Sequence, residues 1–489
     1  MRTSRNRGRN ESLNSASQVA RIQQKLGQAR DAGLAPDGHT GLRLGSVLSE
    51  QAVRGFEDTH GILLPDEYRQ FVTQIGGSGA GPYYGILPLD DWDSATWSGK
   101  EQLPDDFLAR PSPLMPENRC PPSTFSSPDL APGLDPLDQF TQGAIVIAHM
   151  GCAYYALLIV SGPARGRIVY IEYGDPLEFV YFPDNPNFLS WYERWVDELL
   201  AGYNLGWFGF GATGTEDELA RALTDASVSA ARKTEAIRTL RRIRTLTPLS
   251  LESLSFCLRE GDPNLRAAAS SLFIERSGSA GSLRARELLS DESPLVRIAV
   301  LQGIAARSSG KGAAASQAAT TLPWYVFHDP EMEAICRRLV HRLARLFHAS
   351  FGPRLAAGVS LAEVTRILIH DADPEVAATA LRYAKGVLAG EEIRPCLSHS
   401  NPKVRRSAAY AMSGAPDQDV EVLLSVIMND RDLLTRIAAV QALRPERAST
   451  IAVPLAKLLE HDPEPLLRTN IINVLAGLGC SLDDGSKIK

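Results

Sequence analysis

The sequence predicts an α+β domain, a mixed sheet with packed helices, followed by an all-α solenoid of helical repeats. Between about residues 86 and 181, short apolar runs rich in β-branched residues predict strands, and helical patterns flank them. Beyond residue 215, a short polar residue followed by proline recurs at the spacing of helical repeats. The length of 489 residues is too great for one core, which fits two or more domains.

The N-terminal part is expected to be helical before any strand begins. Residues 1–14 are polar and rich in arginine, which predicts disorder, and the pattern over residues 15–32 predicts a short leading helix. Ser49 is a candidate N-cap for the next helix, and Gly61 would end it. Pro65 suits the first turn of a further helix.

Four short segments are expected to form the sheet, and a helix over residues 187–201 follows them. The expected strands are residues 86–89, 144–148, 154–160 and 168–173. Trp191 and Trp195 lie four positions apart on the closing helix, so both should face the sheet.

Residues 143–162 are long enough for a membrane span and contain no Asp, Glu, Lys or Arg. Gly151 interrupts this stretch, and its β-branched residues favour two buried strands over a transmembrane helix. We therefore expect no membrane insertion.

The second half carries an internal repeat. The signal occurs at Asp262-Pro263, Ser293-Pro294, Asp329-Pro330, Asp373-Pro374, Asn401-Pro402 and Asp462-Pro463, with Arg431-Asp432 in the equivalent place between the last two. The polar residue caps a helix, and proline occupies the first helical position, where its missing N–H costs nothing. Such helix pairs bury their apolar faces only by stacking. Downstream arginines are expected to bridge adjacent repeats: Arg266, Arg297, Arg405 and Arg436.

These patterns predict the domain boundaries. Residues 1–40 hold the disordered N-terminus and leading helix, and residues 41–203 the α+β domain. Residues 204–214, crowded with glycine, predict a linker, residues 215–480 the solenoid, and residues 481–489 a flexible tail.

The six cysteines are widely spaced, which favours reduced, mostly buried thiols over disulfides or a zinc motif. No apolar stretch follows the basic N-terminus, so a secretory signal is not expected. Both observations favour the cytoplasm.

The α+β region is strongly acidic. Residues 41–212 contain 22 acidic and 9 basic side chains, a formal charge of −13, whereas the whole chain carries −6. This charge disfavours nucleic acid as a partner and would attract a cationic protein surface. The same charge would also serve an ordinary soluble surface.

Four motifs in the α+β region resemble the SUKH superfamily, which includes yeast cell-wall-synthesis regulators and bacterial immunity proteins. They are LPDEYRQF at residues 64–71, GGSGAGPYYG at 76–85, GCAYY at 151–155 and VYIEYG at 169–174. The resemblance implies a binding module rather than an enzyme, and in bacterial toxin systems such domains are thought to neutralise a toxin, often a nuclease. An appended solenoid is not usual in that pattern.

Residues 215–480 resemble HEAT repeats, in which an apolar residue precedes an arginine. This pair occurs as Leu265-Arg266, Val296-Arg297, Val404-Arg405 and Leu467-Arg468. Glu333 and Ala377 depart from the pattern, so the middle repeats are expected to be irregular.

A candidate partner-binding site lies in the first third of the chain. Asp90, Asp91 and Asp93 surround Trp92 directly after an expected strand, so the carboxylates could accept Lys or Arg while the indole fills a partner pocket. Solvated turn acids and a hard cation are the alternatives. The glycines at 76–85 predict a tight turn that exposes Tyr83 and Tyr84.

No motif indicates catalysis, a metal or a cofactor. The glycine-rich segment lacks the Gly-Lys-Ser/Thr of a phosphate loop and the serine of a nucleophile elbow. His149 and Cys152 are spaced like half a metal site, but their apolar surroundings favour core positions.

The sequence thus predicts a non-catalytic protein-binding molecule, immunity-like or regulatory, whose acidic domain recognises a toxin or another cationic protein, without nucleic acid or membrane. One alternative is a scaffold in which the solenoid carries recognition. An enzyme using the acids at 90–93 is the other.

Overall fold

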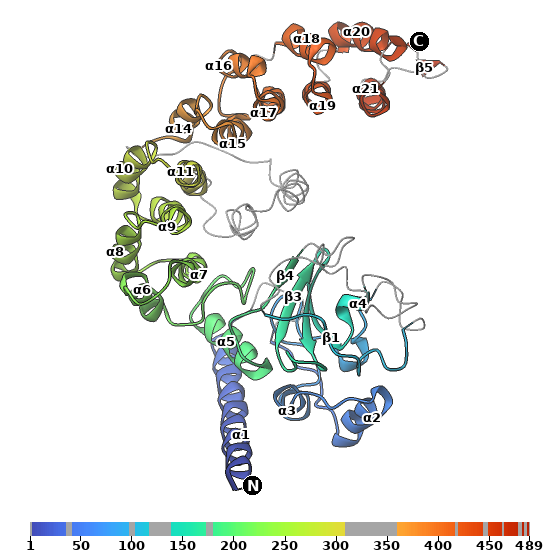
Figure 1. The fold of residues 1–489 in the computed structure, drawn as a ribbon, viewed down its shortest axis with the longest axis vertical. Helices are drawn as coiled ribbons and strands as arrows, with labels where there is room; N and C mark the ends of the chain where they lie inside the picture. Colours follow the sequence, from blue (N-terminus) through green and yellow to red (C-terminus); the bar gives the residue numbers. More distant parts are fainter. Residues whose placement is uncertain are drawn as a thin grey trace. The chain divides into compact units, whose positions relative to one another are not determined.

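The computed structural model describes residues 2–35, 42–96, 103–116, 138–172, 179–308, 359–415, 419–443, 448–461, 464–477, 482–483 and 487–488. The chain forms two compact units, residues 1–253 with 311–350 and residues 254–310 with 351–489. The first contains a sheet with packed helices and the second stacked helices (Figure 1), which confirms the predicted fold class.

A four-stranded antiparallel sheet is central to the first unit. In sequence order its strands are β1 (Ala144–Gly151), β2 (Tyr154–Ile159), β3 (Ile168–Glu172) and β4 (Phe179–Tyr181). All three strand pairings are antiparallel, with Ile145 opposite Leu158 and Ile171 opposite Val180. The expectation of a mixed sheet is therefore wrong. Short loops join β1 to β2 and β2 to β3, and such loops permit only antiparallel neighbours.

The apolar stretch 143–162 supplies β1 and β2, which confirms the strand interpretation. Nowhere in the described part of the chain is a helix both long and apolar enough to span a bilayer.

Three helices with predicted boundaries pack into the domain. α2 (Glu50–His60) is capped by Ser49 and ended by Gly61, as expected, and α3 (Asp66–Gln74) follows Pro65. α5 (Phe188–Leu200) packs on α3, and its Trp191 and Trp195 are both fully buried in one core with Tyr170 of β3. The burial expected for both indoles is confirmed.

The leading helix is longer than predicted. α1 (Arg2–Asp31) begins at Arg2 rather than near residue 15, and residues 2–14 contain no proline that would end a helix there. Val19, Ile22 and Leu26 are buried in the domain core, and α1 packs on α5. α1 is therefore an integral part of the domain.

The first expected strand, residues 86–89, is irregular. Ile86 makes an isolated bridge to Gly79, and Leu87 N–H donates to Ile147 O on β1 at 2.9 Å. Pro88 has no N–H to continue a ladder, and the chain turns directly into the short 3₁₀ helix η1 (Leu89–Asp91). α4 (Asp138–Thr141) precedes β1.

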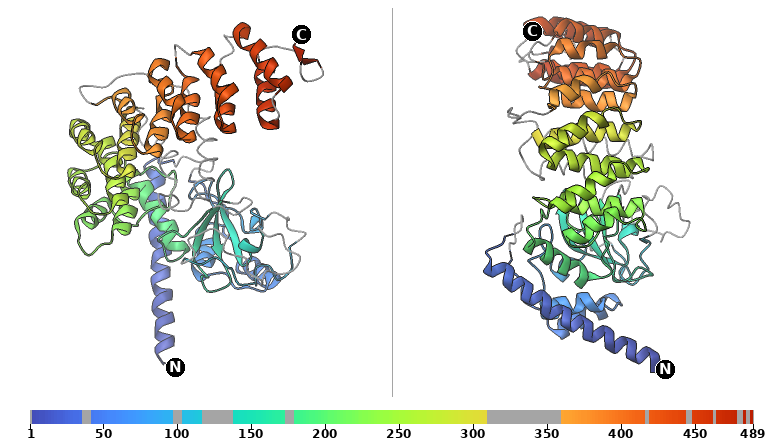
Figure 2. Two further views of the ribbon diagram at one scale, coloured as in Figure 1. Left: turned by 45° about the horizontal axis from the view of Figure 1, so that its top comes forward. Right: turned by 90° about the vertical axis from the view of Figure 1, so that its left-hand side faces the viewer.

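The described helices of the second unit form two layers, visible in Figures 1 and 2. One layer contains α9 (Pro263–Arg276), α11 (Pro294–Ser308), α15 (Pro374–Ala384), α17 (Pro402–Met412), α19 (Leu433–Ala442) and α21 (Pro465–Gly477). The other contains α10 (Gly278–Leu288), α14 (Leu361–Leu368), α16 (Gly390–Ile393), η5 (Arg394–Ser398), α18 (Val420–Asn429) and α20 (Ala448–His461).

The predicted caps define the starts of the first-layer helices. Asp262, Asp373 and Asn401 accept backbone N–H groups at the starts of α9, α15 and α17, with proline following each, and Asp432 caps α19. α21 begins at Pro465, two residues beyond the Asp462-Pro463 start that was expected. Asp329-Pro330 lies outside the described residues.

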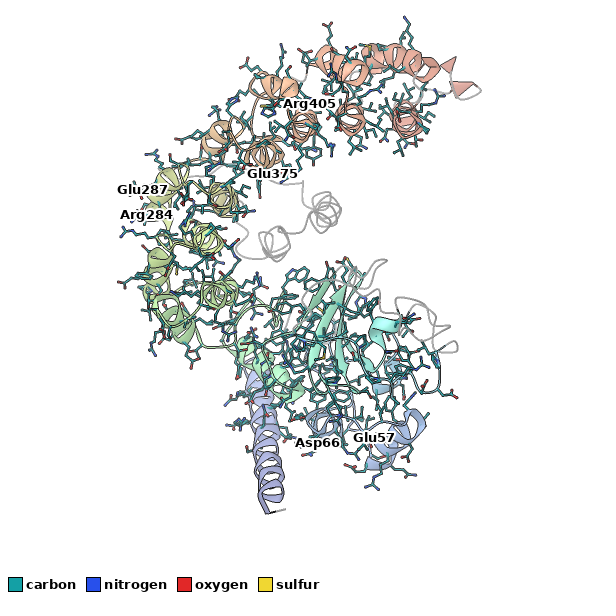
Figure 3. All side chains as sticks on the ribbon, in the orientation of Figure 1. Glu57, Asp66, Arg284, Glu287, Glu375 and Arg405 are labelled. Atoms are coloured by element: carbon teal, nitrogen blue, oxygen red, sulfur yellow. The ribbon has the colours of Figure 1, made fainter. Side chains whose placement is uncertain are left out.

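An arginine–aspartate pair links successive repeats. Arg297 on α11 donates to both carboxylate oxygens of Asp371, at 2.7 and 2.8 Å. Arg405, which Figure 3 labels on α17, pairs in the same way with Asp430. Arg266 contacts Asp291 at 3.2 Å. Each aspartate lies two residues before the cap of the next first-layer helix. These contacts confirm the expected bridges for Arg266, Arg297 and Arg405.

The step from α15 to α17 differs in both partners of this pair. Ala377 on α15 occupies the arginine position, and His399, two residues before the cap Asn401, occupies the aspartate position. In the segment expected to be a flexible tail, β5 (Leu482–Asp483) pairs with β6 (Lys487–Ile488).

Candidate partner-binding surface

The predicted acidic residues lie on a single turn that runs beside β1. Asp90 and Asp91 are exposed on η1, while Asp93 is half-buried. Backbone hydrogen bonds hold the turn: Asp91 N–H donates to Pro88 O at 3.0 Å, and Val146 N–H of β1 donates to Trp92 O at 2.9 Å. None of the ion pairs found among the described residues includes these three carboxylates. The turn therefore presents negative charge from a fixed backbone.

Trp92 does not belong to the exposed site. Its side chain is only 4% exposed and packs edge-on against His60 of α2, with ring centroids 5.1 Å apart, and near Phe107 at 6.0 Å. The expectation that the indole fills a partner pocket is wrong, because the indole already fills one within its own domain. Its burial anchors the acidic turn.

The side chains of Tyr83 and Tyr84 take different positions, one inside the domain and one on its surface, although the residues are adjacent in the sequence. Tyr83 has a left-handed backbone (φ 58°) and turns inward, where its hydroxyl donates to Phe208 O at 2.5 Å. Burial raises the pKa of this phenol well above its ordinary value. Tyr84 is 43% exposed. Only Tyr84 of the pair is therefore available as a surface anchor.

Tyr84 begins a row of three rings at the β1–β2 hairpin. Its centroid lies 5.5 Å from that of His149 on β1, which lies 4.8 Å from that of Tyr155 on β2. His149 and Tyr155 are half-buried. We call Tyr84, His149 and Tyr155 the hairpin patch.

The turn beside the hairpin patch contains Cys152, which is exposed with a left-handed backbone (φ 49°). The core positions expected for His149 and Cys152 are therefore wrong for Cys152 and only partly correct for His149. The described cysteines, Cys152, Cys257 and Cys396, take part in no disulfide.

The acidic turn and the hairpin patch are separate surfaces. Trp92 aligns with Val146 on β1, whereas Tyr84 N–H donates to His149 O at 3.3 Å. Val146 and His149 are three residues apart on β1, which corresponds to about 10 Å along a strand. The candidate residues therefore form two neighbouring surfaces along β1 instead of one site.

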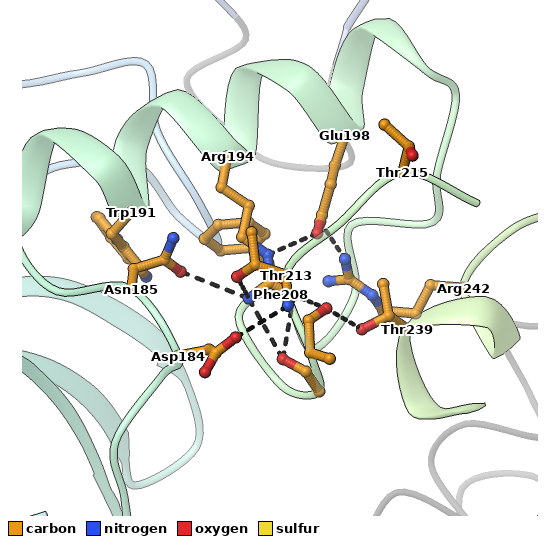
Figure 4. Close-up of polar contacts among 12 residues, drawn as sticks. Asp184, Asn185, Trp191, Arg194, Glu198, Phe208, Thr213, Thr215, Thr239 and Arg242 are labelled. Atoms are coloured by element: carbon orange, nitrogen blue, oxygen red, sulfur yellow. Dashed lines mark hydrogen bonds and ion pairs between the residues drawn. The ribbon is translucent and has the colours of Figure 1, made fainter. Parts of the chain in front are cut away.

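The predicted linker is a packed junction that sequence reasoning missed. Arg194 of α5 is buried and donates to Gly211 O and Ala212 O at 3.3 Å and to Thr213 Oγ1 at 3.0 Å (Figure 4). Gly211 has φ 88°, and a Cβ there would lie 2.6 Å from Thr239 Oγ1. Glycine serves close packing here rather than flexibility.

The junction joins α5 to the first described helix pair after the domain, α6 (Glu216–Thr224) and α7 (Ala230–Arg241); α8 (Pro248–Cys257) follows them. Glu198 accepts from Arg194 at 2.8 Å and forms an ion pair with Arg242, directly after α7. The Arg232 guanidinium of α7 pairs with Asp184 at 2.7 Å. Burial alone would raise the pKa of Asp184, but hydrogen bonds from Arg232 and Thr213 N–H lower it.

Within the described ranges, no three His, Cys, Asp or Glu side chains gather as a metal site requires. The hydroxyls of Ser94 and Thr96 donate to the backbone oxygens of Asp91 and Asp93, at 2.6 and 2.8 Å, and so brace the acidic turn.

Comparisons with known proteins agree with the two-part architecture. Residues 48–194 match the SMI1 / KNR4 family (SUKH-1), and residues 390–476 match HEAT repeats. No curated protein matches the chain.

Solved structures resemble the chain only distantly. Human deoxyhypusine hydroxylase in complex with glycerol is 18% identical, with 54% of this chain and 96% of that chain covered and a TM-score of 0.22. The complex of CpcE and CpcF of phycocyanin lyase from Nostoc is 20% identical, with 55% and 96% covered and a TM-score of 0.26. Such scores carry no argument about function.

The two families that the α+β domain and the stacked helix pairs match indicate a protein-interaction role. The N-terminal domain is a SUKH domain of the SMI1 / KNR4 type, and HEAT repeats follow. The matched range stops within α5, whereas the packed domain also includes α1 and the junction through Ala212.

Proposed function

We propose that this chain is a non-catalytic, immunity-like or regulatory protein of the cytoplasm, whose acidic SUKH domain captures a cationic protein such as a toxin. The charge of −13 over residues 41–212, together with Asp90 and Asp91 exposed on an anchored turn, carries the proposal. A surface of this charge would steer a cationic partner and accept its Lys or Arg side chains.

The anchored turn also suits binding energetically. Trp92 and the Val146–Trp92 backbone hydrogen bond hold the turn before any partner arrives. Association then loses little backbone entropy, because the loop is already ordered. Tyr84 supplies an exposed aromatic anchor nearby, the residue type that concentrates interface energy.

A second candidate is a scaffold in which the repeats carry recognition. The second layer exposes one large apolar side chain on each of four helices: Leu283 on α10, Ile367 on α14, Met428 on α18 and Val453 on α20. Single exposed apolar residues are ordinary on protein surfaces, which places this candidate second.

The test begins with affinity capture by the full chain from its native cytoplasm and identification of the bound proteins. Each purified partner is then titrated against the wild type, the Asp90→Asn/Asp91→Asn variant and the Tyr84→Ala variant. Titrations are run at about 0.05 M and about 0.5 M salt, since the Debye length shortens several-fold between them.

The proposal expects weaker binding by the carboxylate variant at low salt and a smaller difference at high salt. Leu283→Ser/Ile367→Ser is the matched control for the repeats. A partner that ignores the carboxylate and tyrosine variants and salt, but is lost in the repeat variant, would favour the scaffold.

A further inference from the structure

The junction between α5 and α7 places two buried guanidinium groups beside one aromatic ring. The guanidinium carbons of Arg194 and Arg242 lie 5.7 and 5.8 Å from the centroid of the Phe208 ring (Figure 4). Both side chains are buried, with only 4% and 3% of their surfaces exposed. Glu198 forms an ion pair with each of them, so two positive charges share one carboxylate in a place that is nearly closed to solvent.

The two arginines differ in how their N–H groups are satisfied. Arg194 donates from all three of its side-chain nitrogens, to Glu198 and to oxygens of the junction such as Gly211 O. Arg242 pairs with Glu198, but neither its Nε nor its Nη1 has a hydrogen-bond acceptor among the described residues. A buried, charged donor without an acceptor is destabilising, and in folded proteins such a group commonly binds an ion or an ordered water.

The nearby carboxylates take part in other contacts. Glu216, which is only half-buried, accepts from the Ser250 hydroxyl at 2.6 Å. Asp184 pairs with Arg232 at 2.7 Å. The C-terminal end of α7, which Arg242 directly follows, supplies only about half a negative charge. The second positive charge of the junction is therefore only partly offset by the described residues.

This environment defines the chemistry of a ligand. The ligand must carry a single negative charge, because the two arginines and Glu198 leave one positive charge over. It must also be small, because Phe208 is fully buried and the three charged side chains are nearly so. Chloride has this charge and size, and a guanidinium donates charge-assisted hydrogen bonds to anions.

We propose that the junction binds one chloride ion, which accepts hydrogen bonds from the unpaired N–H groups of Arg242. The ion offsets the second positive charge and ties the end of α7 to α5 of the SUKH domain. The site does not depend on the proposed partner, so its test is separate from the test of the proposed function.

Urea unfolding of the full chain at different chloride concentrations tests the site. Chloride is varied from about 0.003 to about 0.3 M, and gluconate replaces it so that the ionic strength stays constant. Tryptophan emission reports on the junction, because Trp191 packs against Phe208. Since only the folded junction binds the ion, the unfolding equilibrium constant should fall about tenfold for each tenfold rise in chloride once the site is mostly filled.

A matched pair of variants assigns the effect to Arg242. Arg242→Met removes the unpaired donors and should abolish the chloride dependence. Arg221→Met, which breaks an exposed pair with Asp217, should retain it. An unfolding constant that ignores chloride in the wild type, or a dependence that persists in Arg242→Met, would overturn the inference.

Direct measurements on the wild type cover the case in which Arg242→Met does not fold. Equilibrium dialysis against radiolabelled chloride should give one bound ion per chain, and crystals grown with bromide should show an anomalous peak beside Arg242. Density at that position without an anomalous peak would assign the unpaired donors to a water molecule and reject the anion. Bromide found only elsewhere on the chain would also reject it.

Discussion

Trp191 on α5 donates a hydrogen bond from its indole Nε1 to the hydroxyl of Tyr170 on β3, at 2.7 Å. Trp195, one turn later, is equally buried, but its Nε1 meets no acceptor among the described residues. Both indoles fill the same core, so the hydrogen bond is the clearest chemical difference between them.

We expect Trp195→Ala to lower the free energy of unfolding by about 3 to 5 kcal/mol, because it removes a buried indole. Replacement by Phe separates the packing and hydrogen-bond contributions. Trp191→Phe should cost about 1 kcal/mol more than Trp195→Phe, since only the former removes an indole hydrogen bond, the one to the Tyr170 hydroxyl. Denaturant unfolding followed by circular dichroism measures both. Equal costs would indicate that the bond contributes no net stability.

Trp92→Ala should act on stability instead of on a partner. Its indole is buried against His60 and Phe107, so we expect a loss of about 3 to 5 kcal/mol. Asp90→Asn/Asp91→Asn should change stability by less than about 0.5 kcal/mol, because both carboxylates are exposed. Thermal melts of the two variants provide the comparison. A fully stable Trp92→Ala protein would restore the indole as a candidate binding residue.

Local chemistry that is explicit in the sequence predicted much of this fold. Ser49 and Gly61 bound α2, and Asp262 and Asp373 cap the repeat helices, because a cap depends on a few adjacent residues. The inward turn of Tyr83 depends on Phe208, which is 125 positions away. No local pattern could reveal that contact.

The candidate site was less predictable for the same reason. The exposure of Asp90 and Asp91 follows from their polarity, but the burial of Trp92 depends on α2 and on the turn around Phe107. The glycines of residues 204–214 suggested flexibility, whereas the packing of Gly211 against Thr239 requires a residue without Cβ. Glycine alone does not distinguish a linker from a close approach.

The junction should resist proteolysis. Arg194 donates to the carbonyls of Gly211 and Ala212, which fixes the backbone that a protease would need to extend. We therefore expect no early cleavage within residues 204–214 under native conditions, when fragments are identified by mass spectrometry. Arg194→Met should expose this segment to cleavage and destabilise the unit by about 1 to 3 kcal/mol, since the buried carbonyls of Gly211 and Ala212 lose their donor while Glu198 keeps Arg242. Arg221→Met, on an exposed pair with Asp217, is the matched control. Early cleavage in the wild type would show that the junction opens readily.

The repeat array should lose stability in acid through Asp430. Burial alone would raise the pKa of this carboxyl, but hydrogen bonds from Arg405 and from Asp432 N–H outweigh burial and lower the pKa. A carboxylate with a lowered folded pKa contributes stability above its unfolded value, near 3.8, and loses it as the pH falls through the folded value.

Asp430→Asn should therefore reduce stability at neutral pH by about 1 to 3 kcal/mol, and the difference from wild type should shrink below about pH 4. The measurement is urea unfolding between about pH 3 and 7. Arg405→Met should show the same convergence, and the double variant should cost less than the sum of the single changes, because both remove one interaction. Curves that remain parallel down to the lowest pH would show that the pair does not cause the acid sensitivity.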